Sequence, residues 1–212
     1  ETNAFKLAMG ELKKQTNILK NLNPTDGTIF GDWSAWSEGE FRIGKFNSSS
    51  NVSDQKFDSY GISLGIDKPY WGNGILGFSL TFGKDDVDIG SLGSKVKSDN
   101  LSFAVYSRFN EINLPPVETT IGIGKNKMGN RRVDGSQTLS GEREVNMIFG
   151  SAKIYSKPYI EDKITLTPYG QLQVAYIELE NYSESGGSLA LTYKNQNVNR
   201  GMASLGTEMI YN

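Results

Sequence analysis

A two-residue alternation of apolar and small polar residues recurs along most of this chain. In residues 76–83 every second residue is leucine or phenylalanine, and the residues between them are glycine, serine or threonine. In residues 59–66 tyrosine, isoleucine and leucine alternate in the same way with serine and glycine. A period of two is that of a β-strand with one apolar face and one polar face. The alternation therefore predicts a sheet, and the question becomes what its apolar face contacts.

Eight antiparallel strands are predicted from this pattern. They cover residues 32–46, 56–68, 74–86, 98–110, 116–127, 143–157, 163–180 and 189–211. Polar and mostly long connections are expected at 47–54, 85–97, 128–142 and 181–188, and tight ones at 69–73, 110–115 and 157–162. Alternating short turns and long loops are typical of an up-and-down outer-membrane barrel.

The composition excludes several classes of function. The chain has 212 residues, a net charge of -2, and neither cysteine nor histidine. Thiol chemistry, histidine catalysis and cysteine–histidine metal sites are therefore excluded, and we expect no metal, no cofactor and no nucleic-acid partner. The mean hydropathy is -0.43, without an apolar run long enough for a membrane helix, but a membrane barrel hides its apolar residues at alternate positions.

The residues on the two strand faces favour a barrel with its apolar face outward. A soluble barrel would carry more lysine and glutamate, and less glycine, on its polar face than these strands do. We therefore expect a lipid-facing set and a pore-lining set. The lipid-facing set is Ile62, Leu64, Phe78, Leu80, Phe103, Val105, Ile121 and Val174. The pore-lining set is Glu38, Glu40, Arg42, Ser63, Gly65, Ser79, Thr81, Arg108, Glu118 and Gln171.

The first residues of the chain predict a helix rather than a strand. Apolar residues recur there at helical spacing, and Asn23-Pro24 ends the segment. We divide the chain into a pore helix over 1–24 and a barrel over 25–212. Eight strands fill their own interior with side chains, so a helix in the bore requires a wider barrel with strands beyond those of this chain. The alternative is a closed eight-stranded barrel with its helix outside.

Five stretches then resemble the C-terminal translocator domain of autotransporters, the type V secretion family. Met9, Gly10, Glu11 and Leu12 resemble the family's pore-helix segment. Residues 32–46 resemble its first strand, 166–172 its seventh strand, 182–186 its tyrosine-x-glutamate-x-glycine loop, and 203–206 its eighth strand. The family barrel has twelve strands with a helix in the pore, and this chain resembles the helix and the first eight strands, so the last four are expected to be missing.

The resemblance implies a function in export. It implies an integral protein of the bacterial outer membrane that carries its own N-terminal passenger domain to the cell surface or into the medium, after which the helix plugs the pore. It also implies three partners: a bilayer containing lipopolysaccharide, the passenger, and the outer-membrane barrel assembly machinery. We expect a monomer, in which Lys13 and Lys14 of the helix pair with charged residues of the lining.

Some members of this family cut themselves in the pore at an asparagine. Asn3 lies at a matching distance before Met9, while Ala4 replaces the second asparagine of the family. A single-turnover self-cleavage at Asn3 is thus one interpretation, and a helix cap is the other. The chain is otherwise not expected to be an enzyme. Two alternatives to the translocator stay open: a small outer-membrane barrel without a passenger, and a soluble barrel of lipocalin type.

Overall fold

The structure is a computed structural model that describes residues 28–48, 53–70, 72–110 and 114–211. Every element in these ranges is a strand. The described residues contain no helix that is long and apolar enough to span a bilayer. The predicted all-β antiparallel fold is therefore confirmed. The helix predicted over residues 1–24, with Asn3, Met9, Gly10, Glu11, Leu12, Lys13 and Lys14, lies outside the described residues.

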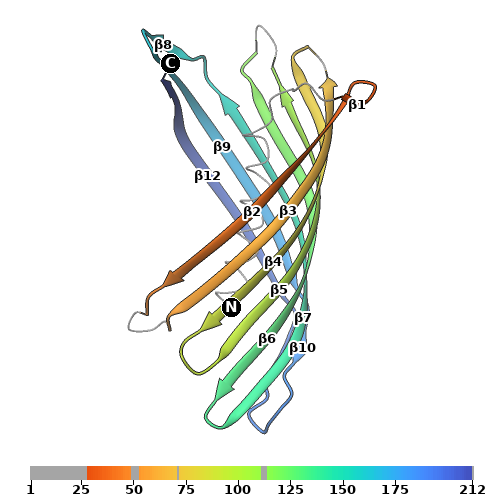
Figure 1. The fold of residues 1–212 in the computed structure, drawn as a ribbon, viewed down its shortest axis with the longest axis vertical. Coiled ribbons are helices and arrows are strands. Elements are labelled where there is room, and N and C mark those ends of the chain that lie inside the picture. The colour runs from red at the N-terminus through yellow and green to blue at the C-terminus, as the bar shows by residue number, and fades with distance from the viewer. Residues whose placement is uncertain (1–27, 49–52, 71, 111–113, 212) are drawn as a thin grey trace.

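Eight long strands form the curved sheet in Figure 1. They are β2 (Trp33–Phe46), β3 (Gln55–Tyr70), β4 (Gly74–Ile89), β5 (Ser94–Phe109), β6 (Val117–Asp134), β7 (Gln137–Tyr155), β9 (Ile164–Leu179) and β12 (Gln196–Tyr211). Four short strands are β1 (Thr28–Phe30), β8 (Tyr159–Glu161), β10 (Tyr182–Ser183) and β11 (Thr192–Tyr193). The alternation of β-branched, aromatic and small residues that predicted them is what a pleated surface accommodates.

Each long strand pairs antiparallel with the next long strand along the chain. The order is β1-β2-β3-β4-β5-β6-β7-β9-β12, with β8 paired to β9 and a separate hairpin of β10 and β11. Among the described residues β2 and β12 are not paired with each other, so the sheet is open and has the form of part of a barrel. The connections after β2, β4, β6 and β9 share one end of the sheet, the lower end in Figure 1.

The prediction of long loops at 85–97 and 128–142, both at the lower end, is wrong. Residues 85–97 and 128–142 continue as strands, and they turn only at Gly90–Gly93 and at Gly135-Ser136. Gly90, Gly93 and Gly135 have φ of 65°, 88° and 59°, the left-handed values that glycine adopts most readily. The prediction failed because most outward residues of these extensions are charged, polar or glycine, which removes the apolar alternation without interrupting the ladder of backbone hydrogen bonds.

The last strand also starts later than predicted. Residues 180–195 form a loop that contains the β10–β11 hairpin, and β12 begins at Gln196 rather than near residue 189. Within β12 the ladder is unbroken, and Asn199 lies opposite Tyr176 of β9.

Candidate functional site

The outer face of the sheet, defined by the exposed alternate residues of each strand, carries an apolar band. Its members line up across strands because the register is continuous from β2 to β9. One such line, here called the apolar row, consists of Leu80, Phe103, Ile123, Ile148 and Tyr176. Ile123 and Ile148 are 59% and 57% exposed, which is unusual for a large apolar side chain in a protein surrounded by water.

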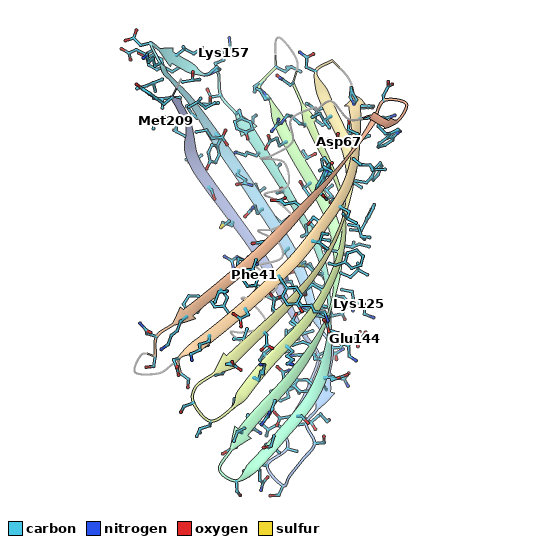
Figure 2. All side chains as sticks on the ribbon, in the orientation of Figure 1. Phe41, Asp67, Lys125, Glu144, Lys157 and Met209 are labelled. Atoms are coloured by element: carbon cyan, nitrogen blue, oxygen red, sulfur yellow. The ribbon has the colours of Figure 1, made fainter. Side chains whose placement is uncertain are left out.

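Charged residues replace the apolar ones toward the lower end of the outer face. The next line of neighbours, the mixed row, consists of Phe82, Leu101, Lys125, Asn146 and Glu178. The line after it, the charged row, consists of Lys84, Asp99, Lys127, Glu144 and Glu180. Figure 2 shows Lys125 and Glu144 together on this face, and their Nζ and Oε2 atoms are 2.7 Å apart.

Further ion pairs join neighbouring strands in this charged region. Lys127 and Glu142 are 2.7 Å apart, and Lys84 and Asp99 are 3.2 Å apart. Lys125 also donates a hydrogen bond to Glu144, and Lys127 donates one to Glu142. Exposed pairs of this kind stabilise a fold only slightly, so their main consequence is a strongly hydrated surface next to the apolar band.

The boundary between apolar and charged residues crosses the strands obliquely. Toward the lower end of the sheet, the last large apolar residue on the outer face of β2 is Ile43, and the last one on β9 is Tyr176. The row of Tyr176 meets β2 at Ser37, six residues before Ile43, which is about 20 Å along a strand. Six strand spacings of about 4.8 Å separate β2 from β9, or about 29 Å. A flat boundary therefore requires strands tilted by about 35°, which is within the range of transmembrane barrels.

The inner face, opposite the outer one, holds all ten residues of the predicted pore-lining set. Ser79, Thr81 and Glu118 are 2%, 2% and 5% exposed, and Ser63 Oγ lies 2.7 Å from Thr81 Oγ1. Glu38, Glu40, Arg42, Gly65, Arg108 and Gln171 occupy the corresponding alternate positions of β2, β3, β5 and β9. All eight residues of the predicted lipid-facing set lie on the outer face. That the first set lines a pore and that the second set contacts lipid both stay predictions.

Charges of the inner face pair with one another. Arg42 Nε lies 2.8 Å from Glu40 Oε1 on the same strand, and the Arg108 guanidinium binds the Glu118 carboxylate across β5 and β6. The predicted pairing of such residues with Lys13 and Lys14 lies outside the described residues. The inner wall is therefore able to balance much of its own charge.

The inner face is less uniformly polar than predicted. Toward the lower end it carries a buried apolar cluster made of Val87, Val96, Ala104, Met128, Val145, Met147, Phe149, Ala175, Ile177 and Leu179. Much of this cluster lies at the level where the outer face becomes charged. The apolar residues thus change faces along the strands. They lie on the outer face in the apolar band, and on the inner face at the level where the outer face is charged. The sequence alternates in both regions, so the period alone does not reveal the change of face.

A polar network on the inner face was missed by the sequence analysis. The Trp36 indole Nε1 donates to the Tyr106 hydroxyl at 2.6 Å, and that hydroxyl donates to Asp67 Oδ2 at 2.9 Å. Tyr106 is 1% exposed and covers Gly77, and Trp36 covers Gly65. The available signal was the pair of inward glycines, since a large side chain can cross a neighbouring strand only where no Cβ is present.

A second missed cluster surrounds Lys153 near the upper end. Its ammonium is 4.4 Å from the ring centre of Tyr155 and 3.9 Å from that of Tyr169, and 2.6 Å from Glu208 Oε1. Lys153 is only 7% exposed, so these contacts replace the water that its charge would otherwise require. The cluster joins β7, β9 and β12.

The loop over residues 180–195 is folded against the β6–β7 hairpin. The Glu184 side chain is 2% exposed and accepts hydrogen bonds from both Arg132 Nε, at 3.2 Å, and Arg132 Nη2, at 2.7 Å. Ser140 and Ser185 exchange backbone hydrogen bonds of 2.9 Å and 2.8 Å. The hydrogen bonds from Arg132 lower the pKa of Glu184, and burial raises the pKa of Tyr182 to about 12. The charged form of Glu184 is therefore part of the folded loop.

The described residues contain no group of three acidic side chains placed to hold a metal ion. Their distinguishing features are the two faces and the tilt that the oblique boundary implies. A family model described as "Autotransporter beta-domain" matches residues 35–212. The chain belongs to the autotransporter β-domain family. This bears out the family resemblance seen in the sequence.

Two curated relatives carry the name extracellular serine protease and come from Serratia marcescens. They are 26% and 24% identical to this chain, over 185 and 181 residues. Each match covers 82% of this chain but 17% of the relative, so the chain spans about a sixth of the length of these proteins.

A solved structure has the same fold. The translocator domain of the autotransporter NalP from Neisseria meningitidis matches with a TM-score of 0.79 at 14% identity. The match covers 97% of this chain and 69% of that domain. The fold of this chain therefore corresponds to about two thirds of the NalP translocator domain.

Proposed function

We propose that this β-domain is the outer-membrane translocator of its own passenger, and that the passenger precedes it in the full-length protein. The observation that carries the proposal is the oblique apolar band of the outer face. A band that is flat only when the strands tilt by about 35° matches a bilayer, and a soluble barrel has no need of such a band. Lipids of the outer membrane, including lipopolysaccharide, would contact it, and the barrel assembly machinery would insert it.

The inner face supports passage of a polypeptide. Small and hydroxylated residues such as Ser63, Ser79 and Thr81 leave space and offer hydrogen bonds without a strong charge of one sign. We propose that the passenger's connecting segment moves along this face during export. Residues 1–24 would then remain in the bore as a helix, with Lys13 and Lys14 near the inner-face carboxylates Glu38 and Glu40.

The test is surface display by the full-length protein in a Gram-negative host. Protease added to intact cells should remove the passenger while the β-domain stays protected, and the β-domain should migrate faster in unheated than in heated samples. A passenger-free barrel would show the second property without the first. A protein that is soluble and monomeric without detergent would overturn the proposal and favour the lipocalin-type alternative.

We also propose that Asn3 is the position at which a passenger would be released, if this protein releases one by self-cleavage. An asparagine side-chain amide can attack its own main-chain carbonyl, which breaks the following peptide bond and needs no further residue as nucleophile. Asn3→Ala should then leave the passenger covalently attached, whereas the control Asn17→Ala should release the passenger as the wild type does. If wild-type protein and Asn3→Ala give the same products, Asn3 is a helix cap instead.

A further inference from the structure

The buried apolar cluster of the inner face lies toward the lower end of the sheet. Under the proposed function this is the external end, since outer-membrane barrels have their longer loops outside. We propose that Phe5 and Met9 of the N-terminal segment, residues 1–24, dock on this cluster and close the external end of the bore with an apolar seal. This inference rests on the proposed function, because it needs residues 1–24 to stay in the bore after export. It adds which side of the bore they contact, and at what height.

The cluster is too deeply buried for the open face of a single sheet. On β7, Met147 and Phe149 are 8% and 2% exposed on the inner face, whereas Ile148 between them is 57% exposed on the outer face. Within the described part of the chain all long strands belong to one sheet, and no helix covers its inner face. A further segment over the cluster would account for the difference, and burying its own apolar residues there would stabilise the contact.

The N-terminal segment is long enough to reach the cluster. Strand β1 pairs with the start of β2, so the chain enters the sheet at the upper end. From Trp33 to Ile43, the last large apolar residue on the outer face of β2, a strand tilted by about 35° descends by about 28 Å. The predicted helix over residues 5–24 also spans about 28 Å, at 1.5 Å per residue. Phe5 would therefore lie at the level where the outer face becomes charged, which is the level of the cluster.

The two sides of the predicted helix match the two sides of the bore. Leu12 lies on the same side as Phe5, whereas Lys14 lies about 200° around the helix from Leu12. Lys14 is about 14 Å along the helix from Phe5. Glu38 is likewise about 14 Å above Ile43 when the tilt of β2 is included. Strand β2 is separated from β7 and β9 by five and six strand spacings, so the lysine side can face Glu38 while the apolar side faces the cluster.

A buried hydrogen-bond acceptor beside the cluster favours a polypeptide as the occupant. Asn126 lies opposite Val145 and is 9% exposed, and its Oδ1 atom is shielded from water without a hydrogen bond from the described residues. A hydrocarbon chain would leave this acceptor unsatisfied, which costs free energy. The first turn of a helix carries backbone N–H groups that have no partner within the helix, and these can donate to such an acceptor.

Disulfide cross-linking of the full-length protein tests the contact, since this chain has no cysteine. Phe5→Cys combined with Ile177→Cys should form a disulfide in most molecules when outer membranes are oxidised, as measured by mass spectrometry of the linked peptides. The matched control combines Phe5→Cys with Ser59→Cys, at the same height on β3, since Ser59 precedes Tyr60, the last large apolar residue on the outer face of that strand. Strands β3 and β9 are about 24 Å apart along the sheet, and a disulfide requires Cα atoms within about 7 Å. The control pair should therefore stay largely reduced.

Conductance measurements test the seal. Purified full-length protein in planar bilayers should be mostly closed. Phe5→Ser combined with Met9→Ser should increase the open fraction about tenfold, the effect on an equilibrium of no longer burying one apolar side chain. Asn21→Ser, on the opposite side of the predicted helix from Phe5, is the matched control and should stay closed as the wild type does. These variants leave the strands unchanged, and heat-modifiable migration checks that the barrel is assembled.

Equal cross-linking of Phe5→Cys to Ile177→Cys and to Ser59→Cys, or no cross-linking to Ile177→Cys, would overturn the proposal. So would an unchanged open fraction in the double serine variant. A β-domain that does not reach the outer membrane, or that displays no passenger, contradicts the proposed function instead. A β-domain that is inserted and displays its passenger, but fails these two tests, contradicts only the seal.

Discussion

The Tyr106 hydroxyl donates a hydrogen bond to Asp67 at 2.9 Å and accepts one from Trp36 at 2.6 Å. These three residues come from β2, β3 and β5, so the network crosses four adjacent strands of the sheet. The path across β4 exists because Gly77 has no Cβ beneath the Tyr106 ring. The network ties together the part of the inner face nearest the upper end.

Tyr106→Phe tests the energetic contribution of this hydroxyl. The variant keeps the ring over Gly77 but removes the hydroxyl that the Asp67 carboxylate and the Trp36 N–H bind. An unsatisfied buried polar group costs about 1–3 kcal/mol. We expect a destabilisation of that size in urea titrations of the detergent-folded full-length protein, followed by heat-modifiable migration. Tyr60→Phe, on the outer face and 52% exposed, is the control and should change stability little. Equal effects of both variants would show that the network is not stabilising.

Gly77→Val tests the crossing itself. A side chain at this position would overlap the Tyr106 ring, which must then leave its place and break both hydrogen bonds. We expect a cost of about 1–3 kcal/mol or more from overpacking, and slower assembly into the outer membrane in pulse-chase experiments. Gly39→Val is the matched control, since no atom lies within 4 Å of a Cβ built at Gly39. Normal assembly of Gly77→Val would contradict the packing described here.

Leu80→Arg tests the assignment of the outer face to lipid. An arginine in the apolar band should cost up to about 2–4 kcal/mol at the bilayer midplane and reduce the amount of heat-modifiable protein in outer-membrane fractions. Leu92→Arg changes a turn residue that is 73% exposed and lies beyond the band, so it should assemble normally. Normal assembly of both variants would mean that the apolar band faces something other than lipid.

Acidification should release the loop over residues 180–195. Because hydrogen bonds from Arg132 lower the pKa of Glu184, its contribution is complete above the ordinary glutamate pKa of 4.5 and is lost as pH falls through the lowered value. The backbone amide of Leu191, which donates to Glu184 Oε2 at 3.1 Å, reports this change directly. We expect its hydrogen-exchange protection factor to be high at pH 7 and to decrease when the pH is brought below the lowered pKa of Glu184.

Glu184→Gln removes the titrating group and should give low protection of Leu191 at both pH values. Glu161→Gln, which lies in β8 at the opposite end of the sheet, is the control and should behave as the wild type. An identical protection factor at neutral and acidic pH in the wild-type protein would contradict the role of the Glu184 carboxylate.

The extent of the strands was only partly predictable. Strands β2, β3 and β9 were placed within about two residues, because their apolar residues alternate along nearly their whole length. The ends of β4, β5, β6 and β7 were not, since residues such as Asp88, Lys95 and Glu142 resemble loop residues when read alone. Cross-strand pairs such as Lys127–Glu142 show that they belong to the ladder, and such a partner is not recognisable before the register is known.

By itself, the amino-acid sequence determined that this chain forms long antiparallel strands, which residues share a strand face, and to which family it belongs. These properties depend on neighbours two residues apart and on the order of short motifs along the chain. The tertiary structure decided the oblique boundary, the change of face by the apolar residues, and the networks around Tyr106 and Lys153. Each of these depends on register between strands. Trp36 and Tyr106 are 70 residues apart in sequence, and only strand pairing brings their side chains together.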